Sequence, residues 1–201
     1  IFVAANDGML HAFYTDDIAA TTTTAKIAAG TEAYAYLPAA VITSGVKDLA
    51  NPDYGTSTVK HQFFNDGELT AGDVYFGSAW HTVVVGTTGR GLAKAVYALD
   101  VTDPANIKFL WERSAADGNA DGNSKYIGQM TGKPVIAQTA NGTWSVLMGN
   151  GYNSAAGKSA LLQFNLSDGT RNGQATTETT GLAAPPVWID PSGNGVSTMA
   201  Y

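Results

Sequence analysis

The chain has 201 residues, of which 11 are Lys or Arg and 17 are Asp or Glu, giving a formal net charge of -6. This balance excludes a generic basic nucleic-acid binder, because phosphate neutralisation needs clustered Lys and Arg side chains. Hydrophobic residues make up 44% of the sequence, so the chain can bury a core, and the absence of Cys excludes disulfides, thiolate metal sites and cysteine nucleophiles.

Short apolar runs separated by turn residues fill the chain from its first residue. Ile1 to Ala5 has the pattern of a strand with no signal sequence before it, so we expect a fragment of a longer protein. One short helix is predicted over Pro38 to Leu49, and no apolar run approaches the roughly 20 residues of a membrane span. The predicted strands are Ile1–Ala5, Met9–Tyr14, Glu32–Tyr36, Asp73–Gly77, His81–Gly86, Ala95–Asp100, Ile107–Glu112, Lys133–Gln138, Trp144–Gly149, Ala160–Leu166 and Pro186–Ile189.

A weak internal repeat groups these strands. Met9–Phe13, Val96–Asp100 and Leu161–Asn165 each follow a glycine-bearing segment and precede a polar turn. About four strands belong to each unit, and a four-stranded sheet repeated around an axis is the blade of a β-propeller. The alternative is an unrelated β-sandwich in which the similarity arises by chance.

Chain length then limits the number of blades. A blade takes roughly 40 to 50 residues and a closed propeller has about four to eight blades. We therefore expect an all-β fold, a partial, unclosed β-propeller of about three to four four-stranded antiparallel blades with long inter-strand loops. It forms a single domain over 1–201, with approximate blades at 1–60, 61–115 and 130–180 and the start of another at 185–201. Its open edges favour either association with a second copy of the chain or an exposed apolar surface on the faces that have no neighbour.

Five segments stand out as a set because of their order along the chain. They are Ile1–Phe13, Phe63–Gly67, Gly72–Gly77, Ala95–Pro104 and Met148–Ser154. In this order they resemble successive landmarks of the PilY/PilC family of type IV pilus tip-associated proteins. Each landmark alone is a weak signal, and the ordered set covers nearly the whole chain.

This resemblance implies a non-catalytic structural and adhesion module of a pilus biogenesis factor. It implies an extracellular or outer-membrane location at the pilus tip, with roles in pilus assembly, retraction control, surface attachment and twitching motility. The implied partners are pilus components and a host or abiotic surface, with no nucleic acid and no membrane span.

The family also has a calcium loop near the end of this region, of the form DxDxNxxxD. Here Asp190 and Asn194 fit that pattern and Val196 offers its carbonyl, whereas Ser192 and Thr198 stand where carboxylates are expected. Calcium affinity rises with the number of carboxylates, so one carboxylate predicts binding no tighter than roughly millimolar. The alternatives are a weak calcium site, which would make the module calcium-modulated, and a turn that has lost the ion.

A second candidate calcium loop follows the second group of strands. Asp117, Asn119 and Asp121 alternate as in the opening of an EF-hand loop, with Gly122 at the sharp turn. The twelfth position is Gly128, so the bidentate acid of a complete EF-hand is absent. The alternative is a flexible polar loop, because Asp, Asn and Gly are also common in exposed turns.

The main enzyme alternative is a quinoprotein. Gly8-x-Leu10-x-Ala12-Phe13 resembles repeats of pyrroloquinoline quinone dehydrogenases, but their cofactor site needs the ring of a complete propeller. We interpret the tryptophans and histidines as structural, because the former lie at strand ends and the latter lack zinc spacing. They are Trp80, Trp111, Trp144, Trp188, His11, His61 and His81.

One long threonine-rich loop remains, from Tyr14 to Ala29. Its length and composition are typical of a surface excursion, which serves either as a recognition element or as a tolerated insertion.

Overall fold

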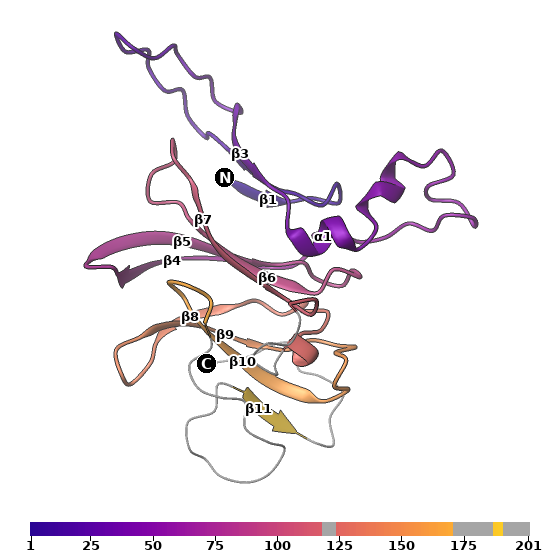
Figure 1. Ribbon diagram of the computed structural model, residues 1–201. Helices are drawn as coiled ribbons and strands as arrows, with labels where there is room; N and C mark the ends of the chain where they lie inside the picture. Colours follow the sequence, from indigo (N-terminus) through magenta and orange to yellow (C-terminus); the bar gives the residue numbers. More distant parts are fainter. Residues whose placement is uncertain (118–123, 171–186, 191–201) are drawn as a thin grey trace.

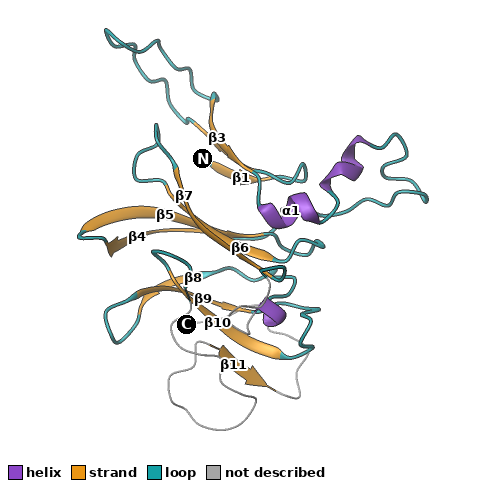
Figure 2. Cartoon of the chain, viewed as in Figure 1, coloured by secondary structure: helices purple, strands orange, loops and turns teal. Residues whose placement is uncertain are grey.

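The computed structural model describes residues 1–117 and 124–170 and the backbone of 187–190, which form three antiparallel β-sheets stacked one on another (Figures 1 and 2). Among the described residues the three sheets are open and do not complete a ring, so the prediction of an all-β, unclosed arrangement is confirmed. Their strands, in spatial and sequence order, are β1 (Phe2–Ala4), β2 (Leu10–Phe13) and β3 (Glu32–Tyr36) in the first sheet, β4 (Leu69–Phe76), β5 (Ala79–Thr87), β6 (Ala95–Asp100) and β7 (Lys108–Ser114) in the second, and β8 (Val135–Gln138), β9 (Trp144–Gly149), β10 (Ser159–Asn165) and β11 (Val187–Asp190) in the third.

The last strand belongs to the third sheet rather than to a new one. β11 pairs with β10 from Ser159 opposite Asp190 to Leu162 opposite Val187. The sequence predicted the start of another blade at 185–201, and the pairing differs because β10 otherwise presents a free edge of unpaired backbone groups. The first sheet also differs from the expected four-stranded blade, since only three of its strands lie within the described residues.

The predicted helix over Pro38 to Leu49 is interrupted. The structure has an α-helix, α1 (Ala39–Thr43), and a 3₁₀ helix, η1 (Val46–Ala50), while a second 3₁₀ turn, η2 (Ser124–Tyr126), precedes the third sheet. Gly45 lies between the first two with a φ of 98°, a left-handed conformation that ends a helix and favours glycine.

Strand β5 is apolar on both faces because both faces are covered. Val83 and Val85 pack in the core between the second and third sheets, whereas Val84 packs against the first sheet. All three are at most 2% exposed. A strand covered on both sides has a continuous apolar run rather than an alternating one, and this makes the second sheet the centre of the structure.

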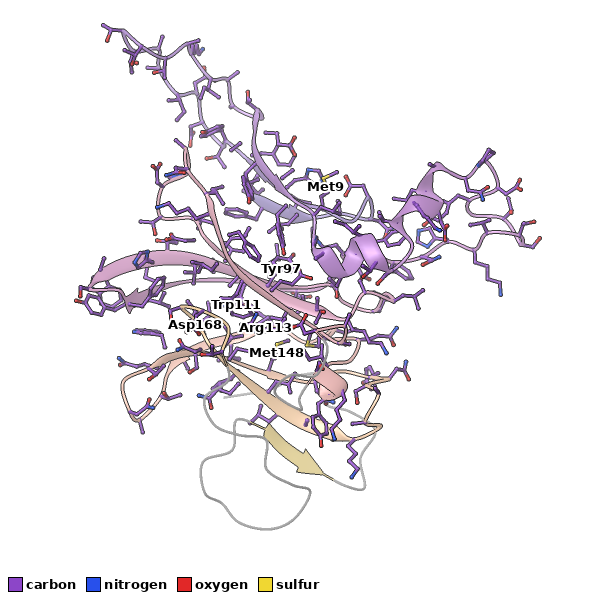
Figure 3. The ribbon with its side chains drawn as sticks, in the orientation of Figure 1. Met9, Tyr97, Trp111, Arg113, Met148 and Asp168 are labelled. Atoms are coloured by element: carbon purple, nitrogen blue, oxygen red, sulfur yellow. The ribbon has the colours of Figure 1, made fainter. Side chains whose placement is uncertain are left out.

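Two core layers flank that central sheet. Tyr97, Leu99 and Leu10 fill the layer toward the first sheet, and Met148 and its neighbours fill the layer toward the third. Figure 3 shows Tyr97 and Met148 in these separate layers.

The tryptophans do not all pack between sheets as predicted. Trp111 does, since it is 3% exposed and its Nε1 donates a hydrogen bond of 2.7 Å to the carbonyl of Leu166. Trp80 is 62% exposed at the β4–β5 hairpin, where its ring meets Trp144 edge-on at 6.2 Å between centroids. The prediction for Trp80 is wrong because this hairpin extends beyond the cover of the first sheet. The side chain of Trp188 lies outside the described residues.

The turn after β10 approaches Trp111 closely enough to require glycine. Gly169 has a φ of 67°, and a Cβ atom at this position would lie 2.5 Å from Cδ2 of Trp111. The indole therefore packs directly on backbone of the third sheet, besides bonding to it.

Replacing Trp111 with Phe should lower the free energy of unfolding by about 1–3 kcal/mol. The ring remains apolar, but the buried carbonyl of Leu166 loses its donor, which costs about that much. Urea unfolding of both proteins measures the difference.

The matched control is Trp80→Phe, because Trp80 is largely exposed and its indole N–H makes no hydrogen bond within the described part of the chain. Its effect should stay within about 0.5 kcal/mol. Equal losses for the two variants would contradict the role assigned to the Trp111 bond.

Candidate functional site

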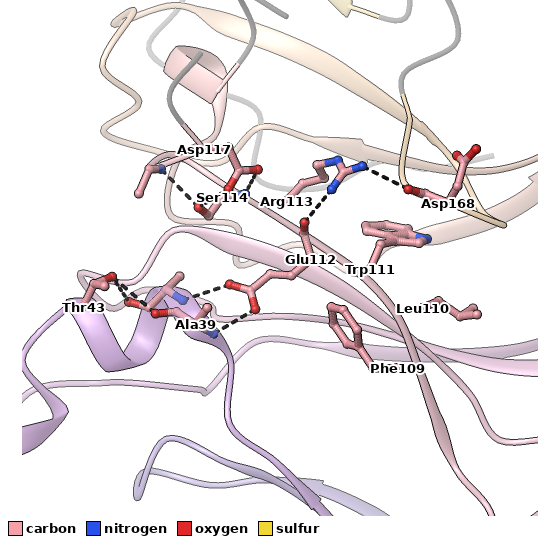
Figure 4. Close-up of a pocket in the computed structure, with 12 residues that line it drawn as sticks. Ala39, Thr43, Phe109, Leu110, Trp111, Glu112, Arg113, Ser114, Asp117 and Asp168 are labelled. Carbon is pink, nitrogen blue, oxygen red and sulfur yellow. Dashed lines mark hydrogen bonds between the residues drawn. The ribbon is translucent and has the colours of Figure 1, made fainter. Parts of the chain in front are cut away.

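A groove of about 480 Å³ lies on the outer rim of the stack, where all three sheets meet (Figure 4). Helix α1 forms one wall, strand β7 forms the floor, and the turn containing Asp168 closes the opposite side. β7 is the outer edge strand of the second sheet, which lies between the other two, and its side chains alternate between the two faces and so reach both neighbouring sheets.

Glu112 joins β7 to the first sheet. Its carboxylate accepts hydrogen bonds from the Tyr36 hydroxyl at 2.5 Å, from the Ala39 amide at 2.8 Å and from the Ala40 amide at 2.9 Å. The last two are amides of the first turn of α1, which have no partner within the helix. One side chain therefore fixes both the end of β3 and the start of α1.

Tyr36 is held as a neutral donor in this arrangement. Burial raises the pKa of its hydroxyl well above the ordinary value, and the hydrogen bond to the Glu112 carboxylate raises it further. The phenol therefore keeps its proton and donates a hydrogen bond to the Glu112 carboxylate.

Trp111 and Arg113 join β7 to the third sheet. The Arg113 guanidinium donates to the carbonyls of Gly169 at 2.9 Å and Asp168 at 3.0 Å, beside the Trp111 bond to Leu166. Arg113 also donates to the carbonyl of Glu112 at 2.9 Å. We call Trp111, Glu112 and Arg113 the β7 junction.

The β7 junction is suited to joining sheets rather than to reacting with a substrate. Its carboxylate already holds three donors and its guanidinium holds three carbonyls. Sequence analysis missed the roles of Glu112 and Arg113, because their partners lie 55 to 76 residues away along the chain.

The second predicted calcium loop is only partly described. The carboxylate of Asp117 accepts bonds of 2.8 Å from both the amide and the hydroxyl of Ser114, which is a local turn. Asn119 and Asp121 lie outside the described residues.

The first predicted calcium loop lies almost entirely outside the residues that the structure describes. Asp190 is the last residue of β11, where the backbone alone is described, and Ser192, Asn194, Val196 and Thr198 lie beyond it. Within the described part of the chain, no three His, Asp or Glu side chains are grouped in a way that could hold a metal ion.

The three histidines lie apart in the structure. His81 Nδ1 lies 2.8 Å from Asp100 Oδ2, and His61 Nε2 lies 3.1 Å from Asn6 Nδ2. Burial acts to raise the pKa of Asp100, but its hydrogen bonds with Thr102 and His81 outweigh burial and lower it.

His11 lies between two carboxylates on the first sheet. Its Nδ1 is 2.5 Å from Glu32 Oε1, and its Nε2 is 2.9 Å from Asp7 Oδ2. The bond to Glu32 raises the pKa of His11 most, the bond to Asp7 and both negative charges add to this, and partial burial opposes them. The histidine thus links the turn after β1 to β3.

The segments that resemble family landmarks act as contacts between sheets and loops. Asn6 donates to the carbonyl of Gln62 at 2.9 Å and accepts from the Phe64 amide at 3.1 Å. In the third sheet, Asn153 donates to Gln129 at 2.5 Å, and Gln129 donates in turn to the carbonyl of Gly91 at 3.1 Å. These polar landmarks hold the loops together at the side of the stack near α1.

Inner strand β4 lies next to the start of inner strand β8, since the Thr70 hydroxyl donates a hydrogen bond of 2.6 Å to the carbonyl of Pro134, the residue before β8. Three antiparallel sheets stacked with their inner strands side by side are the blades of a β-propeller. The model of the PilY1 β-propeller domain family matches residues 1–201. The chain belongs to this family.

Named relatives agree with the family assignment. The chain is 40% identical over 204 residues to a type IV pilus biogenesis factor PilY1 homolog of Xylella fastidiosa, and 40% identical over 206 residues to the type IV pilus biogenesis factor PilY1 of Pseudomonas aeruginosa. These matches cover 100% of the chain and 15% and 16% of the respective relatives.

A solved structure is also similar. The Pseudomonas aeruginosa PilY1 C-terminal domain matches with a TM-score of 0.65 and 36% identity, over 98% of this chain and 32% of that one. Separately, no helix within the described residues has the length and apolar character needed to cross a bilayer.

Stability should depend on pH through His11. Because the folded pKa is raised above 6.5, the histidine contributes stability that is fully present below that pH and is lost as pH rises through the folded value. Urea unfolding of the wild-type protein and of His11→Asn, at about pH 5.5 and about pH 8.5, measures this contribution as a difference.

The free energy of unfolding of the wild-type protein should exceed that of His11→Asn by more at about pH 5.5 than at about pH 8.5. Taking the difference removes the contributions of other titrating groups. An advantage that stays constant or grows with pH would contradict the assignment.

Proposed function

We propose that this chain is a non-catalytic structural and interaction module of a type IV pilus biogenesis factor. It acts in pilus assembly, in control of retraction and in surface attachment, at the pilus tip or outer membrane. Membership of the PilY1 β-propeller domain family supports the pilus role, as do relatives that are named as pilus biogenesis factors.

The β7 junction is the observation that best supports a structural role. Its charged side chains bond to backbone groups of the two neighbouring sheets. Such bonds hold the sheets in a fixed relation and leave both charges satisfied. No observation favours the quinoprotein alternative.

The threonine-rich loop supports an interaction role. It projects away from the sheets as a long arm of loop structure between β2 and β3 (Figures 1 and 2), and reciprocal backbone bonds of 2.8 and 3.0 Å between Ile18 and Ile27 join its two halves. Its tip, Thr21 to Thr24, is exposed. A projecting loop whose tip carries hydroxyl groups is suited to contact with a polar surface or partner.

Two deletions in the encoding gene of a piliated bacterium test this proposal. Removing residues 1–201 should abolish surface pili and twitching. Replacing residues 19–26 with a two-residue turn should leave pilus number unchanged and reduce attachment, because the arm ends are already held together by Ile18 and Ile27. Electron microscopy and adhesion counts measure the two effects.

The matched control for the arm is replacement of exposed Ser57 and Thr58 with Ala, in a loop on another side of the stack (Figure 1). It should leave both pili and attachment unchanged. Normal pili without residues 1–201 would contradict the pilus role, and normal attachment without the arm would contradict its adhesive role.

We further propose that the module binds calcium weakly at the loop that follows β11. Heat should appear in calorimetric titration only at roughly millimolar calcium, as expected for a site with a single carboxylate. Asp190→Ala should abolish it. Asp117→Ala should retain the heat of binding, because the Asp117 carboxylate is already bonded to Ser114.

Two results would contradict this calcium site. No heat from the wild-type protein at millimolar calcium would refute it, and loss of the heat in Asp117→Ala would assign calcium binding to the loop that contains Asp117 instead.

A further inference from the structure

The loop that joins β5 to β6 is held from two sides at the end of the stack near α1 (Figure 1), where Ala93 packs in one core cluster with residues of that helix. On one side, Oδ1 of Asp66 accepts a hydrogen bond of 3.0 Å from the Arg90 amide, and Oδ2 of Asp66 lies 2.8 Å from Arg90 Nε. On the other side, Nε2 of Gln129 donates to the carbonyls of Arg90 and Gly91 at 2.6 and 3.1 Å. These bonds fix the backbone of the loop.

Two glycines let the loop lie directly on the segment that precedes β4. Gly89 has a φ of 73°, and a Cβ atom at this position would lie 2.1 Å from Oδ1 of Asp66. At Gly91 a Cβ atom would lie 1.9 Å from the carbonyl oxygen of Phe63. The glycines therefore form the inner side of the loop, and the larger residues beside them face outward.

Three large apolar side chains are exposed around this loop. Leu92 is 63%, Tyr152 is 46% and Phe63 is 40% exposed. The ring of Phe63 lies against the loop, with its centre 4.8 Å from Cζ of Arg90. Tyr152 lies beside the loop, because its backbone exchanges hydrogen bonds of 2.7 and 3.1 Å with Gln129. Exposed apolar side chains grouped around a fixed backbone are typical of a surface that binds a partner.

The same surface is positively charged, although the chain as a whole has a net charge of -6. A guanidinium has five N–H donors. The Arg90 side chain is 63% exposed, so donors beyond the contact with Asp66 remain free for another acceptor. Lys94 Nζ donates to the Asn153 carbonyl and forms no ion pair with a carboxylate among the described residues. Two cations beside one carboxylate are complementary to an acidic ligand.

We call Phe63, Arg90, Leu92, Lys94 and Tyr152 the Arg90 patch. We infer that the Arg90 patch binds a segment of a partner protein in which a carboxylate side chain stands beside an apolar side chain. Arg90 donates two N–H groups to the carboxylate, and the apolar side chain packs on the three exposed apolar residues. This inference rests on the interaction role proposed above and adds the chemistry of the partner.

The fixed position of Arg90 favours such a ligand. Asp66 and the face of the Phe63 ring hold the guanidinium before the ligand arrives, so binding costs less conformational entropy. A small anion such as phosphate would bond to Arg90 but would leave the apolar side chains uncovered. A peptide with both kinds of side chain satisfies the charge and covers the apolar surface.

Selection from a random peptide library displayed on phage tests this inference on the full-length polypeptide that contains this chain. The library is first depleted on the Arg90→Gln variant, which removes peptides that bind elsewhere, and is then selected on the wild-type protein. The recovered peptides should share Asp or Glu next to Leu, Phe, Tyr or Trp.

Fluorescence anisotropy with a labelled synthetic copy of a recovered peptide then measures the contribution of each group. Arg90→Gln should raise the Kd at least about ten-fold, and so should replacing the acidic residue of the peptide with its amide. Leu92→Ser should also weaken binding, and this variant leaves the contact between Arg90 and Asp66 intact. Urea unfolding shows that each variant remains folded.

The matched control is Lys108→Gln, which removes an exposed cation at the opposite end of the second sheet, where Lys108 pairs with Asp100. Its Kd should equal that of the wild-type protein. An equal loss in this variant would indicate attraction by overall charge and would overturn the assignment to the Arg90 patch.

Three further results would overturn the inference. They are recovered peptides without acidic residues, equal binding to the wild-type protein and to Arg90→Gln, and equal binding to the wild-type protein and to Leu92→Ser. Competition by inorganic phosphate at the concentration of the peptide would identify a general anion site and would also overturn it. These measurements need no pili, so their failure is distinct from a failure of the proposed pilus role.

Discussion

The alternation of side chains along β7 holds the three sheets together. Successive residues of a strand leave its backbone on opposite faces. Glu112 therefore bonds toward the first sheet, while Trp111 and Arg113 bond toward the third. Because their partners are mainly backbone groups, the contact fixes the positions of main chain segments. The core layers on both sides of the second sheet supply the apolar burial, and β7 sets the relation of the sheets at the rim.

The sequence predicted the strands well because their local patterns are strong. Each strand signal lies within a few consecutive residues. Examples are the apolar run around Val84, the aromatic and aliphatic stretch at Tyr97 and the polar turns between them. Boundaries and helices were harder to predict. Gly45 divides the expected helix because its φ of 98° stops helical bonding, and a sequence pattern alone does not show whether a glycine takes that conformation.

The sequence patterns could not predict which distant segments of the chain contact each other. Trp80 and Trp111 both stand in strands, yet one is exposed and one is buried, because burial depends on where a neighbouring sheet ends. The charge of Glu112 gave no sign that it would meet α1. Asp117 has the residue type of a calcium ligand, but its carboxylate bonds to Ser114 within the same turn.

The bonds that meet at Glu112 also make one side chain essential to two elements of the first sheet and its helix. Tyr36, Ala39 and Ala40 all donate to the same carboxylate. Loss of this carboxylate therefore removes the acceptor of one phenol and of two helix amides in a single step, so the end of β3 and the start of α1 lose their link to β7 together.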